Sequence, residues 1–221
     1  MTHVVHPYSH RLGIIRDWKS RWFAKKGQYK DYLKGDVLLR NYLEKRLRGN
    51  YVASIDMERS EKVLRIIIKT SRPGMVIGRN GEGSTKLRSD VLAFMKKHDL
   101  VSHDDLRLDI EDVKSPESNA MIVAQMIAES LEKRMPFRRV MKQTVDKVLA
   151  NRDVKGVKIE LAGRLGGADM ARREKMRKGQ VPLQTFRADV DYAHTEAFLP
   201  YDSLGVKVWI YKGEVFDNKN K

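Results

Sequence analysis

The stretch Arg72-Pro73-Gly74-Met75-Val76-Ile77-Gly78-Arg79-Asn80-Gly81-Glu82 decides how the first half of the chain folds. Its later glycines, 78 and 81, follow an apolar run and precede a segment whose apolar residues recur at helical spacing, namely Leu87, Val91, Leu92, Phe94 and Met95. Glycine lets one backbone approach another closely, and the N-terminus of a following helix carries positive potential. We therefore predict that the loop of Gly78, Arg79, Asn80 and Gly81 binds phosphate groups.

The Gly-x-x-Gly spacing is informative only in its setting. Gly163-Arg164-Leu165-Gly166 has the same spacing, but it follows a predicted strand and leads into no amphipathic helix. A Walker loop is excluded because no Gly-Lys-Ser or Gly-Lys-Thr follows, and a dinucleotide fingerprint needs a third glycine and a parallel βαβ setting. The remaining interpretation is the backbone clamp of KH modules, which here implies an unpaired RNA segment. We call residues 78–81 the KH loop.

The patterns around this loop predict an α+β protein. Helical periodicity extends over 29–48, alternation predicts strands over 51–58 and 63–69, and a helix ending near His98 is followed by a strand over 106–111. Together these elements form an RNA-binding domain over 29–112. The apolar residues of the first helix, which we expect to face the core, are Leu33, Val37, Leu38, Tyr42, Leu43 and Leu47.

A second α+β domain is predicted over 113–216. Ser115-Pro116-Glu117 has the pattern of a helix start with Ser115 as the N-cap, and helices are expected over 116–134 and 137–150. Strands are predicted over 157–161, 186–192 and 206–211, with a further strand or extended loop over 165–177. The ends are an N-terminal arm, 1–28, and a frayed tail, 217–221.

Charge is the most informative property of the composition. The 221 residues carry 44 Lys and Arg against 29 Asp and Glu, a net charge of +15, which favours a polyanionic partner. Basic residues are concentrated in 1–30 and in 133–142. A membrane-surface protein would need a basic amphipathic helix or a lipidation signal, and neither is found. No apolar stretch reaches membrane-spanning length and no signal-peptide layout begins the chain, so we expect a soluble protein. The absence of cysteine excludes disulfides and Cys-based metal sites.

Six ordered blocks resemble one family, the bacterial small-subunit ribosomal protein three. They are His6-Pro7 with Arg11-Leu12-Gly13, Trp22-Phe23-Ala24, residues 72–78, Phe137-Arg138-Arg139-Val140-Met141-Lys142, residues 163–168, and Gly205-Val206-Lys207-Val208-Trp209-Ile210. The resemblance implies a type II KH domain followed by a C-terminal α+β domain, two helices on a mainly antiparallel sheet. It also implies a cytoplasmic, ribosomal location and binding to ribosomal RNA in the head of the subunit. The implied protein partners are small-subunit proteins ten and fourteen.

The same resemblance assigns messenger RNA contacts to Arg138, Arg139 and Lys142, which we call the 138–142 cluster. Their spacing lets all three lie on one side of a helix, away from the apolar stripe. In the family such residues line the channel through which messenger RNA enters and help to unwind it. Further candidates for contact with ribosomal RNA are Arg11, Lys25, Lys26, Arg164, Arg172 and Arg173.

The sequence gives weaker support for metal sites and catalytic sites. A metal site at His3, His6 and His10 lacks nearby acidic partners, and the acidic pairs Asp104-Asp105 and Glu111-Asp112 suit capping better than two-metal catalysis. No cofactor fingerprint is present, so we expect no enzyme, metal or cofactor. A nucleic-acid enzyme and a free KH regulator are the alternative functions. The aromatic residues of the arm could stack on bases, but we expect them to anchor it on its own domain or on a neighbouring protein: Trp18, Trp22 and Phe23.

Overall fold

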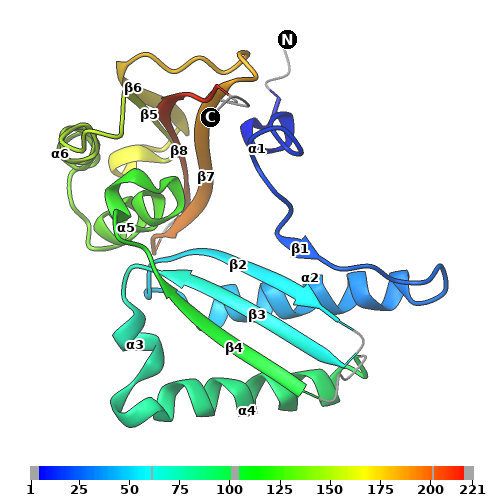
Figure 1. The fold of residues 1–221 in the computed structure, drawn as a ribbon. Coiled ribbons are helices and arrows are strands. Elements are labelled where there is room, and N and C mark those ends of the chain that lie inside the picture. Colours follow the sequence, from blue (N-terminus) through cyan, green and yellow to red (C-terminus); the bar gives the residue numbers. More distant parts are fainter. Residues whose placement is uncertain (1–4, 61, 101–104, 201, 217–221) are drawn as a thin grey trace. The chain divides into compact units, whose positions relative to one another are not determined.

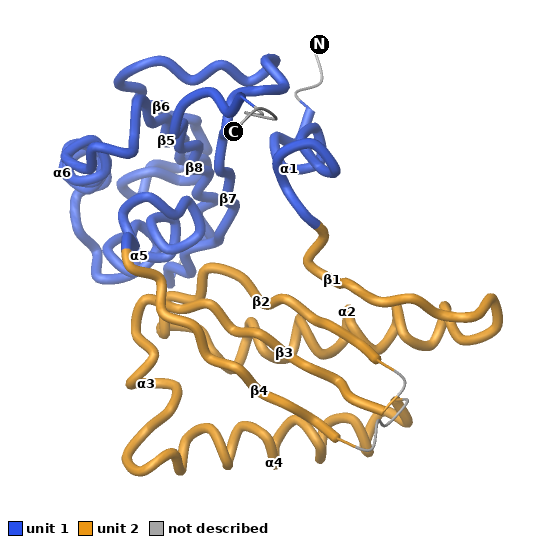
Figure 2. The backbone as a smooth tube through the Cα atoms, viewed as in Figure 1, with its two compact units in different colours: residues 1–17, 115–221 blue, residues 18–114 orange. Residues whose placement is uncertain are grey.

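The structure is a computed structural model that describes residues 5–60, 62–100, 105–200 and 202–216. The chain divides into two compact units, residues 18–114 and residues 1–17 together with 115–221 (Figure 2). The stretch predicted as a single arm, 1–28, is therefore shared between the units. The predicted tail, 217–221, lies outside the described residues.

The unit of residues 18–114 contains a four-stranded sheet in the order β1-β2-β3-β4 (Figure 1). Strands β2 (Val52–Arg59) and β3 (Val63–Thr70) are antiparallel, whereas β4 (Asp105–Asp112) runs parallel to β3. The short β1 (Ser20–Arg21) pairs parallel to β2. Helix α2 (Tyr29–Arg46) precedes the sheet, and α3 (Pro73–Ile77), the 3-10 turn η1 (Arg79–Gly81) and α4 (Glu82–Lys97) connect β3 to β4. This order is the predicted KH arrangement.

Helices α2 and α4 form one core with the sheet. Leu39 and Leu43 of α2 are fully buried, and Val91 and Met95 of α4 join the same cluster. The prediction for α2 was wrong at Leu33 and Val37, which are each 46% exposed. The buried face of α2 is instead rotated toward Gly35 and Asp36.

A buried ion pair explains that rotation. The Nε and Nη2 atoms of Arg59 donate to Oδ1 of Asp36 at 2.8 and 2.6 Å, and both side chains are almost completely buried. The indole Nε1 of Trp22 donates to Oδ2 of Asp36 at 2.7 Å. The anchoring predicted for the aromatic residues is thus confirmed for Trp22. Phe23 is 91% exposed and Trp18 is 61% exposed, so for these two residues anchoring on a neighbouring protein stays a prediction.

The second unit is built on an antiparallel sheet in the order β6-β5-β8-β7. Its strands are β5 (Gly156–Gly163), β6 (Arg172–Gly179), β7 (Ala188–Phe198) and β8 (Ser203–Glu214). Helices α5 (Ala120–Glu132) and α6 (Phe137–Leu149) cover one face of the sheet and share its main core (Figure 1). Two 3-10 turns, η2 (Pro116–Ser118) and η3 (Leu165–Gly167), precede α5 and β6.

The start of α5 differs from the prediction. Pro116–Ser118 form a separate 3-10 turn, and the N-cap of α5 is Asn119, whose side chain accepts hydrogen bonds from the backbone N–H groups of Met121 and Ile122. Asparagine is among the most favoured N-caps, and Ser115 makes no side-chain cap. The true helix therefore begins four residues later than expected.

The short helix α1 (Pro7–His10) belongs to this second unit and contacts β7. Arg11 follows it and is fully buried. Its guanidinium donates to the backbone carbonyl oxygens of Pro7, Pro182, Leu183, Thr185 and Ala188. Burial lowers the pKa of Arg11 from its ordinary value, while the nearby Asp189 acts in the opposite direction.

Candidate nucleic-acid interface

The KH loop lies between two helices. The apolar run before it forms helix α3, so a short helix, rather than a strand, leads directly into the glycines. Gly78 has φ 73°, Asn80 has φ 50° and Gly81 has φ 80°, so three of the four residues occupy conformations that favour glycine or asparagine. The backbone of the loop thus favours glycine or asparagine at positions 78, 80 and 81.

Close packing of α3 against α4 depends on a glycine that the sequence analysis missed. A Cβ atom added to Gly83 would lie 2.6 Å from the carbonyl oxygen of Val76 and 2.8 Å from that of Ile77. One added to Gly78 would lie 3.0 Å from the backbone nitrogen of Gly83. The only signal in the sequence was a glycine in the first turn of a helix, where it is usually unfavourable.

The surface of the KH loop is open to a ligand. Gly78, Arg79 and Asn80 are exposed, and the side chain of Arg79 makes no hydrogen bond or ion pair with the residues that the structure describes. The hydroxyls of Ser84 and Thr85 donate to the Gly81 carbonyl oxygen at 2.8 and 3.1 Å and hold the loop onto α4. The loop therefore presents a positive charge at the N-terminus of a 16-residue helix.

The 138–142 cluster lies on the first two turns of α6. Val140, Met141, Val145 and Val148 of this helix are buried, whereas Arg138, Arg139 and Lys142 are exposed. No acidic residue stands in the first turn and Pro136 offers no side-chain cap, so the unpaired N–H groups point toward a region already rich in cations. Cations at a helix N-terminus oppose the helix dipole, and a bound phosphate would remove that conflict.

Strand β6 brings one further candidate, Arg172, to this cluster. The guanidinium of Arg138 lies 3.4 Å from Glu174, and that of Arg172 lies 3.5 Å from the same carboxylate. Both guanidinium carbons also approach the ring of Phe137, at 5.6 and 5.8 Å from its centroid. The side chain of Arg138 is nevertheless 73% exposed. The structure thus joins Arg172, predicted separately, to the 138–142 cluster.

The remaining predicted residues have different surroundings. Lys25 and Lys26 are exposed in the turn before α2. Arg173 is exposed and lies 3.4 Å from Glu160. Arg164 donates to the carbonyl oxygen of Ala168 at 2.9 Å and contacts Asp169, so it holds its own loop together. Arg11 was wrongly predicted to contact RNA, because its guanidinium is fully buried among backbone carbonyls.

Comparison with known proteins finds a family match for each of the two parts of the chain. Residues 38–118 match the KH domain family, and residues 127–210 match the family described as ribosomal protein S3, C-terminal domain. The chain is 46% identical to the small ribosomal subunit protein uS3 of Xanthomonas oryzae pv. oryzae over 217 residues, 98% of this chain and 86% of that protein. It is 42% identical to the uS3 protein of Clostridium novyi over 97% of this chain and 94% of the relative. For the uS3 protein of Pseudomonas paraeruginosa the identity is 45%, covering 98% and 92%. The chain belongs to the uS3 family.

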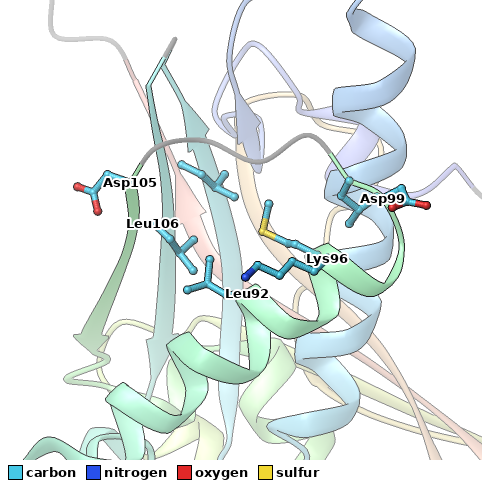
Figure 3. Close-up of a pocket in the computed structure, with 8 residues that line it drawn as sticks. Leu92, Lys96, Asp99, Asp105 and Leu106 are labelled. Atoms are coloured by element: carbon cyan, nitrogen blue, oxygen red, sulfur yellow. The ribbon is translucent and has the colours of Figure 1, made fainter.

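Beyond its two basic surfaces, this uS3 family member has a pocket of about 280 Å³ in the KH unit (Figure 3). It is lined by residues from β3, α4 and β4, together with two residues of the segment after α4: Leu64, Leu92, Met95, Lys96, Asp99, Leu100, Asp105 and Leu106. Asp105 is already paired with Arg88 and Arg107. None of the predicted RNA-binding residues lines this pocket.

The sites set aside in the sequence have ordinary structural surroundings. His6 meets the ring of Tyr192 edge-on and His10 stacks on Phe186, while His3 and Asp104 lie outside the described residues. Glu111 and Asp112 are exposed at the end of β4. Within the described ranges no group of three potential metal ligands comes together, and no helix there has the length and apolar character needed to cross a membrane.

Proposed function

We propose that this chain is a structural constituent of the small ribosomal subunit that binds ribosomal RNA in the head and contacts messenger RNA where it enters. Membership of the uS3 family supports the ribosomal part. The observation that carries the messenger part is the exposure of Arg138, Arg139 and Lys142 together on the start of α6. In this role the chain binds the phosphates of an RNA strand through fixed positive charges and carries out no catalytic step.

The two surfaces suit different tasks. The KH loop offers backbone and one cation to a single strand, as KH modules do. The 138–142 cluster offers several cations and unpaired helix N–H groups over a short distance, which can hold the phosphates of a strand that has been separated from its partner. Holding separated strands opposes re-pairing and thereby assists unwinding of structured messenger RNA.

The protein partners we propose are small-subunit proteins ten and fourteen, by family resemblance. The KH unit, the C-terminal unit and the N-terminal segment then act as parts of one ribosomal component. A free KH regulator is the competing function, because the KH loop alone would serve it equally well.

One experiment tests both halves of the proposal. The tagged wild-type chain and a variant carrying Arg138→Gln, Arg139→Gln and Lys142→Gln are expressed in bacteria, and small subunits are isolated on sucrose gradients. Both chains should sediment with small subunits. Subunits carrying the variant should bind unstructured messenger RNA with a salt slope shallower by up to about two units, at roughly 0.7 per lost phosphate contact.

The matched control removes three charges from another surface. Lys30, Lys34 and Lys45 of α2 are exposed, and the α2 control carries Gln at all three positions. Its salt slope should stay close to that of the wild type. Recovery of the wild-type chain only in fractions free of ribosomal subunits would disprove the ribosomal role. A slope for the 138–142 variant equal to that of the α2 control would disprove the messenger contact.

A further inference from the structure

The C-terminal sheet has a second face, opposite α5 and α6. Val157, Ile159 and Leu161 of β5 point into the main core, so Lys158 and Glu160 point to the other face. On the β7–β8 half of this second face, Val190, Trp209 and Tyr211 are buried in a cluster of their own, and α1 contacts β7. The β5–β6 half carries charged residues instead.

We call the β5–β6 half of the second face the open half. The residues of β6 that point to it are all cations, except for Gly179 at the end of the strand. Arg173, Lys175 and Arg177 are all exposed, and their partners on β5 are Ala162, Glu160 and Lys158, respectively. Arg177 therefore stands directly opposite Lys158. Like charges in directly opposite positions of an antiparallel pair destabilise the sheet.

Few carboxylates compensate these cations. Glu160 is the acidic residue of β5 on this half, and it is shared between Lys158 at 3.7 Å and Arg173 at 3.4 Å. Lys175 stands directly opposite Glu160, but neither Lys175 nor Arg177 forms an ion pair with an acidic residue among those that the structure describes. The one hydrogen bond given for Arg177 is from its Nε to the carbonyl oxygen of Gly179.

The KH sheet provides an internal comparison, because its charged residues are paired with opposite charges. Its ion pairs join neighbouring strands: Arg21 with Glu58, Arg65 with Glu58 and Asp109, and Lys69 with Asp56 and Glu111. A sheet face exposed only for solubility normally mixes both signs in this way. The excess of one sign on β5 and β6 thus calls for a different explanation.

We propose that Lys158, Arg173, Lys175 and Arg177, which we call the open-face cluster, bind the phosphate backbone of RNA. The three cations of β6 follow one another at a spacing of about 7 Å, two residues along a strand, and can contact successive phosphates. Phosphate binding also relieves the repulsion between Lys158 and Arg177. The inference holds whichever RNA the 138–142 cluster contacts.

The two RNA surfaces of this unit lie on opposite faces of one strand. Arg172 and Glu174 of β6 lie beside Arg138, whereas Arg173, Lys175 and Arg177 alternate with them and point the other way. An acidic protein partner fits the open-face cluster less well. The centres of protein interfaces are apolar and poor in lysine, while the uncharged residues at this half of the face are small, namely Ala162, Gly156 and Gly179.

The test measures binding of the full chain to single-stranded polyuridylate over a range of salt concentrations. An open-face variant carries Arg173→Gln, Lys175→Gln and Arg177→Gln, and Lys158 is left in place because its ammonium lies over the ring of Trp209. We expect the salt slope to become shallower by up to about two units. Because the two surfaces are separate, the losses of the open-face and 138–142 variants should add when combined.

Two further variants make the result decisive. A conservative variant with Arg173→Lys, Lys175→Arg and Arg177→Lys keeps the charges and should retain the wild-type slope. The α2 control removes the same charge elsewhere and should change the slope far less. An open-face slope equal to that of the α2 control overturns the proposal. If the open-face variant folds normally, has the slope of the α2 control and also fails to join small subunits, the face binds a protein. The RNA proposal is likewise overturned by that result.

Discussion

At the scale of single residues, one guanidinium holds the N-terminal segment in the second unit. Arg11 directs its N–H groups at carbonyl oxygens of residues 182–188, which are far away in sequence. These carbonyls belong to the irregular segment before β7 and to its first residue. No shorter side chain could satisfy several of them at once, because only arginine offers a fork of five donors.

Replacing Arg11 with methionine should therefore lower the free energy of unfolding by about 1–3 kcal/mol, the usual cost of leaving buried acceptors unpaired. Urea denaturation of the full chain measures the change. The matched control is Arg16→Met, which removes a partly exposed ion pair with Asp189 and should cost less than about 1 kcal/mol. Equal losses for the two variants would contradict a special role for Arg11.

Arg11 also illustrates what residue-level reading of the sequence could not reveal. Its charge favoured contact with RNA, and nothing near it in the sequence indicated acceptors some 170 residues away. Asp36 escaped notice for the same reason, since its partner Arg59 is on a different element. Exposed cations on a periodic helix, such as Arg139 and Lys142, could be predicted because helix geometry alone places them.

At the scale of elements, the KH loop depends on how closely α3 approaches α4. Gly83→Ala should destabilise the KH unit by about 1–3 kcal/mol, because the new methyl group meets backbone carbonyls that cannot move independently. It should also weaken binding to single-stranded RNA, since the loop geometry follows the two helices. Denaturation and filter binding of the full chain measure the two effects.

Gly74→Ala is the matched control for this substitution. A Cβ atom at Gly74 meets nothing within 4 Å, and its backbone is not in the left-handed region. We expect a neutral or slightly stabilising effect, of at most about 1 kcal/mol. RNA affinity that is unaffected by Gly83→Ala would show that the loop does not need this close approach.

Most elements were predictable because their hydrophobic periods are regular. The α+β class, the order of the main KH elements and the helices α2 and α4 followed from alternation and helical spacing. The errors occurred where tertiary contacts outweighed local pattern. Leu33 and Val37 fit a helical stripe, yet α2 turns another face inward because Asp36 must reach Arg59. The short α3 was hidden by Pro73 and Gly74, which usually interrupt structure.

At the scale of the whole molecule, the boundary between the units falls at residue 18 instead of at the predicted 29. We propose that residues 18–114 form an independently folding KH unit. A fragment of residues 29–114 lacks β1 and the hydrogen bond from Trp22 to Asp36. It should be less stable than the 18–114 fragment by about 2 kcal/mol or more, since hydrogen bonds to buried charges contribute about 1.5–3 kcal/mol.

Urea midpoints of the two fragments measure this difference. Trp22→Phe within the longer fragment serves as the control, because it removes the hydrogen bond and leaves β1 in place. It should account for part of the loss but not all of it. Identical midpoints for the two fragments would instead put the boundary at residue 29.

Strand β6 is an edge strand of its sheet, and this position affects the protein before it binds RNA. An end strand offers unpaired backbone groups to the end strand of any other copy, which is a route to aggregation. Here Arg172, Arg173, Lys175, Arg177 and Lys178 all lie on that strand. Two copies brought edge to edge would press these charges together, so newly made chains repel one another and stay dispersed until a polyanion neutralises the strand.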